Sequence, residues 1–371
     1  MALANDPPLE ERAQRQRPRA SAAERIGRLD LDPVLRARLL PLCRLGPGEV
    51  WTDSVRGHRV GVLDAAQPDQ VEALMAGERT GLLIADPPYN LVLGGRPSGA
   101  LPRRALADYL AFSAAWIGNA VGCLKADAHF YLWLGADVKH GFQPLPDVML
   151  LLRGFPALRP RNLITLRNQR GFGTGSNWMW VRQELLYYVK GNPPFDPAAD
   201  VTEIPKILRG YYKEVGGRLT ENRERGRSPF IRAGNVWVDI QQVFYRLREN
   251  VPGCYAQKPL KAIERLLLSG IAAGDLVVDF FAHSGTTLVA GERLGKRVYT
   301  LDDDPIFAEI TIRRLERLRA TGETGWQWHS PFPEIAGPEG GREHRPFRGA
   351  GRVLARVRAP ARPPPRNRAR P

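Results

Sequence analysis

Residues 81–90 read GLLIADPPYN, an apolar run that ends in an acid, two prolines and an aromatic residue. A continuous apolar run of this length predicts a strand buried on both faces, as in a parallel sheet covered by helices. Asp86 then follows the carboxyl end of the strand, the edge where such sheets place ligand sites. Pro87 and Pro88 remove two N–H donors, so a carbonyl there can point outward as an acceptor. Together with the Asp86 carboxylate and the ring of Tyr89, it suits an exocyclic amine on a planar ring.

A second stretch, residues 279–287, reads DFFAHSGTT and predicts a strand that runs into a turn of small residues and then a helix. Small residues let a ligand approach the backbone and the helix N-terminus closely. The stretch lacks the lysine of a phosphate loop and most glycines of the dinucleotide fingerprint. The next expected strand ends at Asp302, where a carboxylate can accept hydrogen bonds from ribose hydroxyls. The segment indicates a nucleoside-containing cofactor, with a tight turn and a capping acid as the alternative.

Apolar runs alternate with helical patterns from about residue 50 onward, which is typical of the α/β class. The expected strands span residues 59–63, 82–85, 129–134, 162–166, 185–189, 276–281 and 298–301, and the expected helices span 106–124 and 258–269. Asp304 as N-cap, Pro305 as first helical residue and Gly322 at the end predict a further helix. We therefore expect a doubly wound, mostly parallel sheet of Rossmann-like type.

The chain has 371 residues, and 54 Lys and Arg against 39 Asp and Glu give a formal net charge of +15. This balance points to nucleic acid, to an anionic membrane surface or to a basic tail. The N-terminal segment has no apolar core of a signal peptide, and no apolar run is long enough to span a bilayer. Three distant cysteines and six dispersed histidines indicate reduced thiols and no metal site. We expect a cytoplasmic protein with no membrane association.

Together, the two motifs resemble those of the DNA amino-methyltransferases, which transfer a methyl group from S-adenosylmethionine to an exocyclic base nitrogen. Residues 86–89 match the family's catalytic pattern [D/N/S]-P-P-[Y/F/W], and residues 279–287 are similar to its cofactor motif D-P-F-x-G-S-G-T-T. The catalytic motif comes first, which is the order of the beta class. The resemblance covers about residues 50–320 and implies the methyltransferase fold and double-stranded DNA as partner. It also suggests a homodimer and a cognate restriction endonuclease as candidate partners.

The resemblance places Asp86, Pro87, Pro88 and Tyr89 in catalysis. The predicted cofactor-binding residues are Asp64, Asn90, Lys258, Asp279, Phe281, Ala282, Ser284, Gly285, Thr286, Thr287 and Asp302. The target base would be flipped out of the duplex, with its amine held between the Asp86 carboxylate and the Pro87 carbonyl for in-line transfer. Asp at the first motif position, with Asn after the Tyr, favours N6 of adenine in this family, and N4 of cytosine is the alternative.

Three positions depart from the family's pattern. Leu63 stands where the family has a Gly before Asp64, Phe280 where it has Pro, and His283 where it has its first Gly. We expect the His283 ring to point outward, with capping of the cofactor pocket as the alternative. Residues 192–195, NPPF, also fit the catalytic pattern. We prefer Asp86 because a purely apolar strand precedes it, whereas the later match opens a proline-rich region.

The sequence predicts five segments: an N-terminal arm with a short helix (1–45), a catalytic half (46–190), a loop-rich target-recognition insert (191–255), a cofactor-binding half (256–330) and a disordered basic tail (331–371). In the insert, basic residues alternate with aromatic ones, which suits phosphates, guanine edges and stacking. The predicted DNA-binding residues are Arg209, Lys213, Arg218, Arg223, Arg225, Arg227 and Arg232.

Three other functions fit the same observations. An enzyme of this fold can act on cytosine N4 or on RNA. A catalytically inert DNA-binding protein can retain a methyltransferase fold, although the intact motif at residues 86–89 argues against it. The basic tail can also be the sole contact with nucleic acid.

Overall fold

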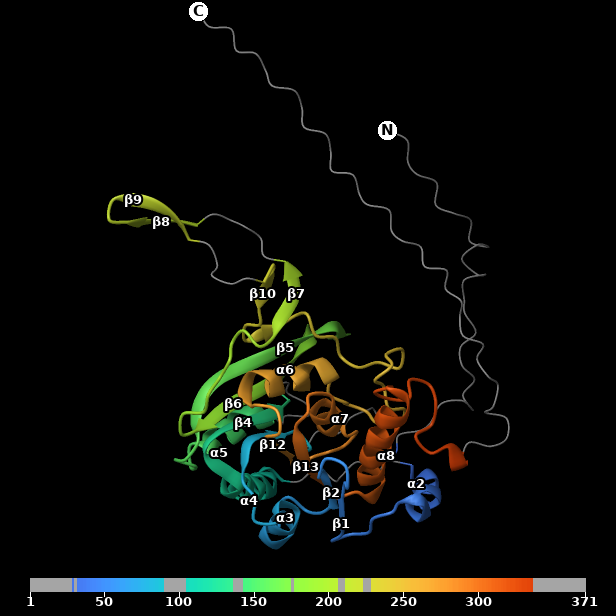
Figure 1. Cartoon of the computed structure of the whole chain (residues 1–371). Helices are drawn as coiled ribbons and strands as arrows, with labels where there is room; N and C mark the ends of the chain where they lie inside the picture. The colour runs from blue at the N-terminus through green and yellow to red at the C-terminus, as the bar shows by residue number, and fades with distance from the viewer. Residues whose placement is uncertain are drawn as a thin grey trace, which may run out of the picture. The chain divides into compact units, whose positions relative to one another are not determined.

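The computed structural model describes residues 29, 32–89, 105–135, 143–174, 177–205, 211–222 and 228–335 (Figure 1). A nine-stranded sheet runs through this part, in the order β1-β2-β13-β12-β3-β4-β6-β5-β11. Its strands are β1 (Val50–Thr52), β2 (Arg59–Val62), β3 (Thr80–Ala85), β4 (Leu124–Leu134), β5 (Arg159–Thr174), β6 (Asn177–Lys190), β11 (Val236–Trp237), β12 (Leu276–Asp279) and β13 (Arg297–Asp302).

The centre of the sheet is parallel, from β2 through β13, β12 and β3 to β4. Only β1 and β6 run against their neighbours. Asp279 at the end of β12 pairs with Ile84 of β3 on one side and with Thr300 of β13 on the other. The ends of these three strands therefore meet at one edge, and the predicted doubly wound, mostly parallel sheet is confirmed.

Helices cover both faces of the sheet (Figure 1). One face carries α3 (Pro68–Met75), α4 (Leu106–Cys123) and α5 (Pro144–Leu152), and the other carries α6 (Leu260–Gly270), α7 (Thr286–Arg293) and α8 (Pro305–Thr321). Successive side chains of a strand point to opposite faces, so Leu83 and Ala85 lie in the first core while Leu82 and Ile84 lie in the second. A run of apolar residues on both faces, such as residues 82–85 of β3, is what two covered faces require.

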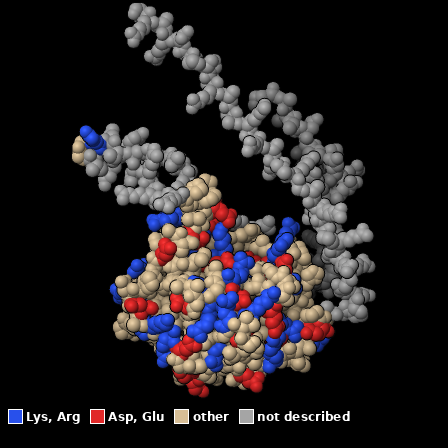
Figure 2. All heavy atoms as spheres, viewed as in Figure 1, with Lys and Arg blue, Asp and Glu red and all other residues tan. Residues whose placement is uncertain are grey.

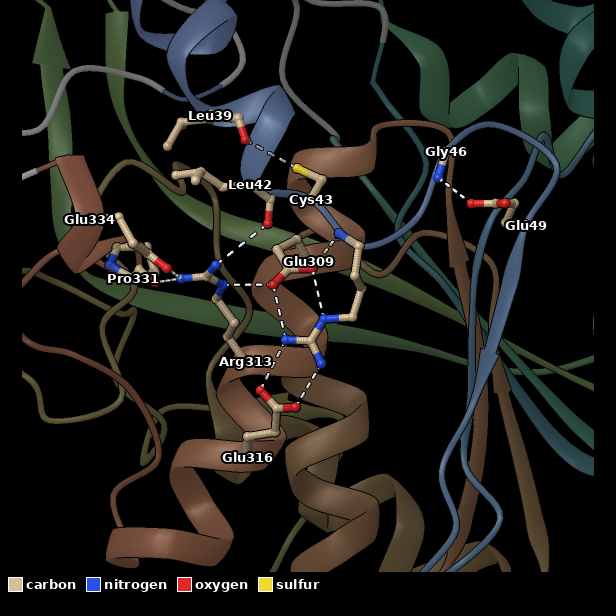
Figure 3. A network of polar contacts seen from close by, with 11 residues as sticks. Leu39, Leu42, Cys43, Gly46, Glu49, Glu309, Arg313, Glu316, Pro331 and Glu334 are labelled. Carbon is tan, nitrogen blue, oxygen red and sulfur yellow. Dashed lines mark hydrogen bonds and ion pairs between the residues drawn. The ribbon is translucent and has the colours of Figure 1, made fainter.

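A third apolar cluster joins the two ends of the described chain. Leu29 and Leu39 of the segment around α2 (Pro33–Leu39) pack with Phe307 of α8 and with Phe332, next to the short η3 (Pro333–Ile335). Polar contacts hold the same region (Figure 3). The buried Glu309 of α8 accepts hydrogen bonds from Arg44 Nε at 3.0 Å and from Arg313 Nε at 2.6 Å. This network fixes the segment that leads from the short η2 (Leu40–Leu42) into β1.

The expected elements are present, and the start and end of α8 are as predicted. Asp304 Oδ1 accepts from the backbone N–H of Ile306 at 3.0 Å, and Gly322 ends the helix with φ +75°. The described residues contain no helix long and apolar enough to cross a membrane.

Two regions are more regular than the sequence predicts. Strands β5 and β6 extend far beyond the expected ranges 162–166 and 185–189. The region expected to be loop-rich contains two strand pairs, β7 (Val201–Pro205) with β10 (Phe230–Arg232) and β8 (Tyr211–Val215) with β9 (Arg218–Asn222). From the same region, β11 pairs with β5 in the main sheet. Contacts group the chain up to Ile335 into one unit, and the finer segment boundaries stay predictions.

Candidate active site

The two motifs meet at the carboxyl edge of the parallel strands. Because β3 and β12 are neighbours, Asp86 and Asp279 follow or end adjacent strands. One pocket lies between them and the residue pair Lys258 and Trp133, from the segment before α6 and the end of β4. Its lining residues are Ile84, Asp86, Trp133, Lys258, Ile263, Asp279, Phe281, Ala282, His283, Ser284, Thr286 and Thr287.

Asp86 contacts two other predicted site residues directly. Its Oδ2 lies 2.5 Å from Lys258 Nζ, and its Oδ1 accepts from the Tyr89 hydroxyl at 2.8 Å. The buried Lys258 ammonium also lies 5.3 Å from the centroid of the Trp133 ring and 5.5 Å from that of Tyr89. A carboxylate and two aromatic faces thus compensate the buried cation. Each carboxylate oxygen keeps a further lone pair that can accept from an amine.

Asp279 is buried at the base of the pocket. Burial raises its pKa to about 6, against hydrogen bonds from the Thr287 hydroxyl and the Phe281 N–H that lower it. The Phe281 N–H reaches Oδ1 at 3.0 Å. The charge of Asp86 raises the pKa of Asp279 further, whereas Lys258 lowers it. Two carboxylates facing one lysine give the pocket an acidic balance, which favours a cationic ligand.

Residues of α8 pack against the turn before α7 and donate hydrogen bonds to it. Gly285 has φ +72°, and a Cβ at this position would lie 2.9 Å from the Cα of Thr311. Arg314 of α8 is fully buried, and its Nη1 donates to Ser284 O at 2.8 Å and to Thr286 Oγ1 at 3.1 Å. Burial lowers the pKa of Arg314 to about 10, so the guanidinium is charged at neutral pH. The sequence does not single out Arg314, because nothing in the helical pattern distinguishes it from its neighbours.

The family departures at positions 280 and 283 have structural consequences. Phe280 is completely buried in the core beneath α4. His283 has φ +44°, a left-handed conformation that glycine adopts without strain. His283 is one of the residues that line the pocket, and its ring packs against Phe307 with 4.7 Å between centroids, which favours the capping alternative over our expectation that the ring points outward. The backbone strain costs on the order of 1 kcal/mol.

A second hollow lies beside the first, at the ends of β2 and β13. It is lined by Pro47, Gly48, Val62, Leu63, Asp64, Gln70 and Asp303. Asp302 instead turns toward the backbone, where its oxygens accept from the N–H groups of His283 at 2.8 Å and Asp304 at 3.1 Å. Burial raises the pKa of Asp302 well above its ordinary value. Asp303 is therefore the second carboxylate of this hollow, beside Asp64, and sequence analysis had assigned it no role.

The second proline pair lies at the opposite edge of the sheet. β6 runs antiparallel to β4, and Lys190 pairs with Ala128 near the start of β4, whereas Ala85 pairs with Leu132 near its end. The backbone N–H of Asn192 donates to Asp127 Oδ1 at 2.6 Å. Residues 192–195 are thus separated from the pocket by the length of the strand.

The remaining predicted residues divide into two groups. Asn90, Arg209, Arg223, Arg225 and Arg227 lie outside the described residues. Lys213 lies in β8, Arg218 begins β9 and Arg232 ends β10, and the last two side chains are exposed.

Within the described ranges, no group of three or more His, Cys, Asp or Glu side chains is arranged to hold a metal ion.

Residues 80–313 match the sequence profile of a DNA methylase family of the N6/N4 type, which spans both motifs and the strands that carry them. The chain belongs to this DNA methylase family. The match confirms the predicted amino-methyltransferase resemblance, with S-adenosylmethionine as the family's methyl donor.

Curated relatives and a solved structure agree with this assignment. Type II methyltransferase M.HpaI of Haemophilus parainfluenzae is 26% identical over 236 residues, 63% of this chain and 68% of that protein. Type II methyltransferase M.BamHI of Bacillus amyloliquefaciens is 25% identical over 224 residues, 59% of this chain but only 49% of that protein. A crystallised PvuII DNA methyltransferase, cytosine-N4-specific, superimposes with a TM-score of 0.50 at 14% identity, over 73% of this chain and 89% of its own, which shows the shared fold.

Proposed function

We propose that this DNA methylase transfers a methyl group from S-adenosylmethionine to N6 of adenine at a specific site in duplex DNA. The observation that carries the proposal is one pocket lined by residues of both motifs, Asp86 from the catalytic one and Asp279 to Thr287 from the cofactor one. Adenine is favoured over cytosine N4 by Asp86 at the first motif position and Asn90 after the tyrosine.

The pocket has the chemistry that S-adenosylmethionine requires. That molecule supplies an electrophilic methyl group on a sulfonium, and it also carries an ammonium and a carboxylate. The carboxylates of Asp86 and Asp279 suit the two cations, and the Lys258 ammonium suits the carboxylate. In the second hollow, Asp64 and Asp303 present carboxylates to ribose hydroxyls. Gly285, in this proposal, shapes the turn and Asp302 fixes it, while Phe281, Ala282, Ser284, Thr286 and Thr287 line the methionine end.

The residues of the catalytic motif would act on a flipped base. The Asp86 carboxylate and the Pro87 carbonyl accept the two amine hydrogens, so that the nitrogen lone pair is directed at the methyl group. The Tyr89 hydroxyl donates to Asp86 at 2.8 Å, which orients its ring as a stacking surface for the base. The nitrogen would attack the methyl carbon as the bond from that carbon to sulfur breaks, leaving a neutral thioether, and would then release one of its two protons to solvent. As positive charge develops on the nitrogen, the fixed carboxylate beside it stabilises the transition state.

The test is transfer of labelled methyl from S-adenosylmethionine to duplex DNA by the purified protein. Asp86→Ala removes the acceptor and is expected to lower the rate at least 100-fold, the scale of losing one preorganised group. Asn192→Ala, in the second proline pair at the far edge, is the matched control and should keep full activity. Normal activity in Asp86→Ala would overturn the proposed mechanism.

Sequencing of modified bases in DNA from cells that express the protein identifies the base and the recognition site. Methylation at cytosine N4 would replace the adenine assignment, and tight DNA binding without transfer would indicate an inert binding protein. Because M.HpaI and M.BamHI are type II methyltransferases, we further propose a cytoplasmic enzyme that protects DNA beside a restriction endonuclease. A homodimer is the remaining partner proposal. Measuring the molecular mass in solution by sedimentation equilibrium tests it.

A further inference from the structure

Strands β5 and β6 extend past the edge that holds the pocket. Glu184 of β6 pairs with Leu134, the last residue of β4, and with Thr165 of β5. On the other side, β11 pairs with β5 only as far as Leu166. Residues 167–174 and 177–183, here called the arm, thus continue as a two-stranded ribbon beyond both neighbours. At about 3.3 Å per residue the arm spans on the order of 20 Å.

The arm stands at the active-site edge of the sheet. β4 runs parallel to β3, and Trp133 near its end lines the pocket beside Asp86. The arm begins where β4 ends, since β6 enters the sheet at Glu184 opposite Leu134. A duplex that delivers a flipped base to this pocket therefore meets the arm.

Two arginines lie directly opposite each other on the arm. Arg167 pairs directly with Arg182 across the two strands, and both side chains are exposed. Like charges directly opposite in a strand pair are destabilising. Glu184 lies 3.3 Å from Arg182 Nε, but it is buried and also accepts from Thr165 Oγ1 at 2.7 Å. One carboxylate for two guanidiniums leaves a net positive site.

The arm contains three basic residues, Arg167, Arg170 and Arg182, and no acidic residue. Elsewhere, on the face seen in Figure 2, basic and acidic side chains are interspersed. Paired guanidiniums bind phosphate oxygens with good geometry, so the ligand that fits the arm is an anion.

An exposed aromatic side chain lies on the same ribbon. Trp178 is 89% exposed, more than any other large apolar side chain of the described residues, and the adjacent Met179 is 61% exposed. Trp178 lies four positions from Arg182 in the same strand, next to a shift in the register of the β5–β6 pairing. Apolar side chains beside arginines are typical of surfaces that contact bases or wedge into a groove.

We propose that the arm is a DNA-binding element that takes backbone phosphate between Arg167 and Arg182 and presents Trp178 to the bases beside it. This inference rests on the proposed function, since it assumes duplex DNA at the pocket. It assigns part of DNA recognition to β5 and β6, outside the insert where sequence analysis predicts it.

The test compares DNA affinity at several salt concentrations, using a 20-base-pair duplex and protein loaded with S-adenosylmethionine. The double variant Arg167→Gln/Arg182→Gln is expected to bind more weakly and to reduce the slope of log affinity against log salt by about 1. Trp178→Ala is expected to weaken binding about tenfold with the slope unchanged. Cofactor affinity and melting temperature should stay at the wild-type values in both.

Arg79→Gln/Arg153→Gln is the matched control, because both arginines are exposed and precede strands β3 and β5 at the opposite edge. An unchanged affinity and salt slope in the arm variant would overturn the proposal and point to an acidic protein as the arm's partner. An equal loss in the control would overturn it by showing that the effect is not specific to the arm. Failure of wild-type protein to methylate DNA would instead refute the proposed function. Trp178→Ala carries the test if the arginine variant does not fold.

Discussion

Asp279 shows how strongly the fold changes the chemistry of one residue. Its ordinary pKa of 3.8 is raised to about 6 because its carboxylate is buried beside that of Asp86. Between these values the folded protein holds a proton that the unfolded chain has released. Stability therefore falls as pH rises from about 4 to 6, and at neutral pH the cost is on the order of 3 kcal/mol.

Replacing Asp279 by Asn should remove this cost. Without cofactor, we expect Asp279→Asn to be more stable than wild type above pH 6, by up to about 3 kcal/mol, with a much smaller difference near pH 4. Urea unfolding of both proteins at several pH values measures it. A difference that does not vary with pH would show that burial of the charge is not its origin. The same variant should bind S-adenosylmethionine more weakly, because it lacks a carboxylate in the pocket.

The identity of these residues could be predicted from the sequence, but their surroundings could not. Asp86 and Asp279 are found because their motifs lie at the ends of apolar segments in a pattern that a parallel sheet explains, and Lys258 is found through the family resemblance alone. The left-handed backbone of His283 and the contact of its ring with Phe307 depend on how α8 packs on the turn. No local pattern encodes that packing.

Helix α8 acts on the site as an element, through Arg314. Its guanidinium donates to the backbone carbonyls of Ser284, Thr324 and Glu249 at 2.8, 2.6 and 3.2 Å. We expect Arg314→Met to lower the free energy of unfolding by about 2–4 kcal/mol, because the carbonyl oxygens of Ser284 and Thr324 lose this donor, whereas Glu249 O keeps the hydrogen bond from Gln257 Nε2. Cofactor affinity should fall as well, since the turn before α7 is no longer fixed.

Calorimetric titration with S-adenosylmethionine and thermal unfolding measure the two effects of Arg314→Met. Arg317→Met is the control, because Arg317 lies on the same helix and donates to Gly325 O without contact to the turn. Equal losses in both variants would mean that α8 supports the fold alone and does not position the cofactor turn.

Strand direction is the element-scale property that the sequence did not reveal. Two proline pairs follow strands, at residues 86–89 and 192–195, and only the antiparallel course of β6 separates them to opposite edges. The length of β5 and β6 was also missed, because the arm lacks the apolar alternation that marks a strand in the sequence. Only the pairing of its two strands with each other shows that it is extended. Buried strands such as β3 and β12 were found because both of their faces are covered.

At the scale of the whole molecule, the excess charge divides between residues 1–335 and residues 336–371. Residues 336–371 contain ten basic and two acidic residues, so a chain that ends at Ile335 falls from +15 to about +7. We expect this truncation to keep its melting temperature and its methyl transfer at low salt. Its affinity for nonspecific duplex should fall and depend less on salt, because fewer phosphates are neutralised. Binding measured from 50 to 200 mM salt checks this, and complete loss of DNA binding would place recognition in the tail.

The strand order has a consequence for how the protein is made. In the sheet, Leu82 pairs with Val277 and Val60 pairs with Thr300. At about 5–20 residues per second, a ribosome needs roughly 10–40 seconds to proceed from β3 to its partner β12. During that interval β3 has one unpaired edge along its apolar residues 82–85, a template for pairing with other chains. The active site is thus absent from every nascent chain until synthesis has passed Asp302, and aggregation competes with closure of the sheet for most of that time.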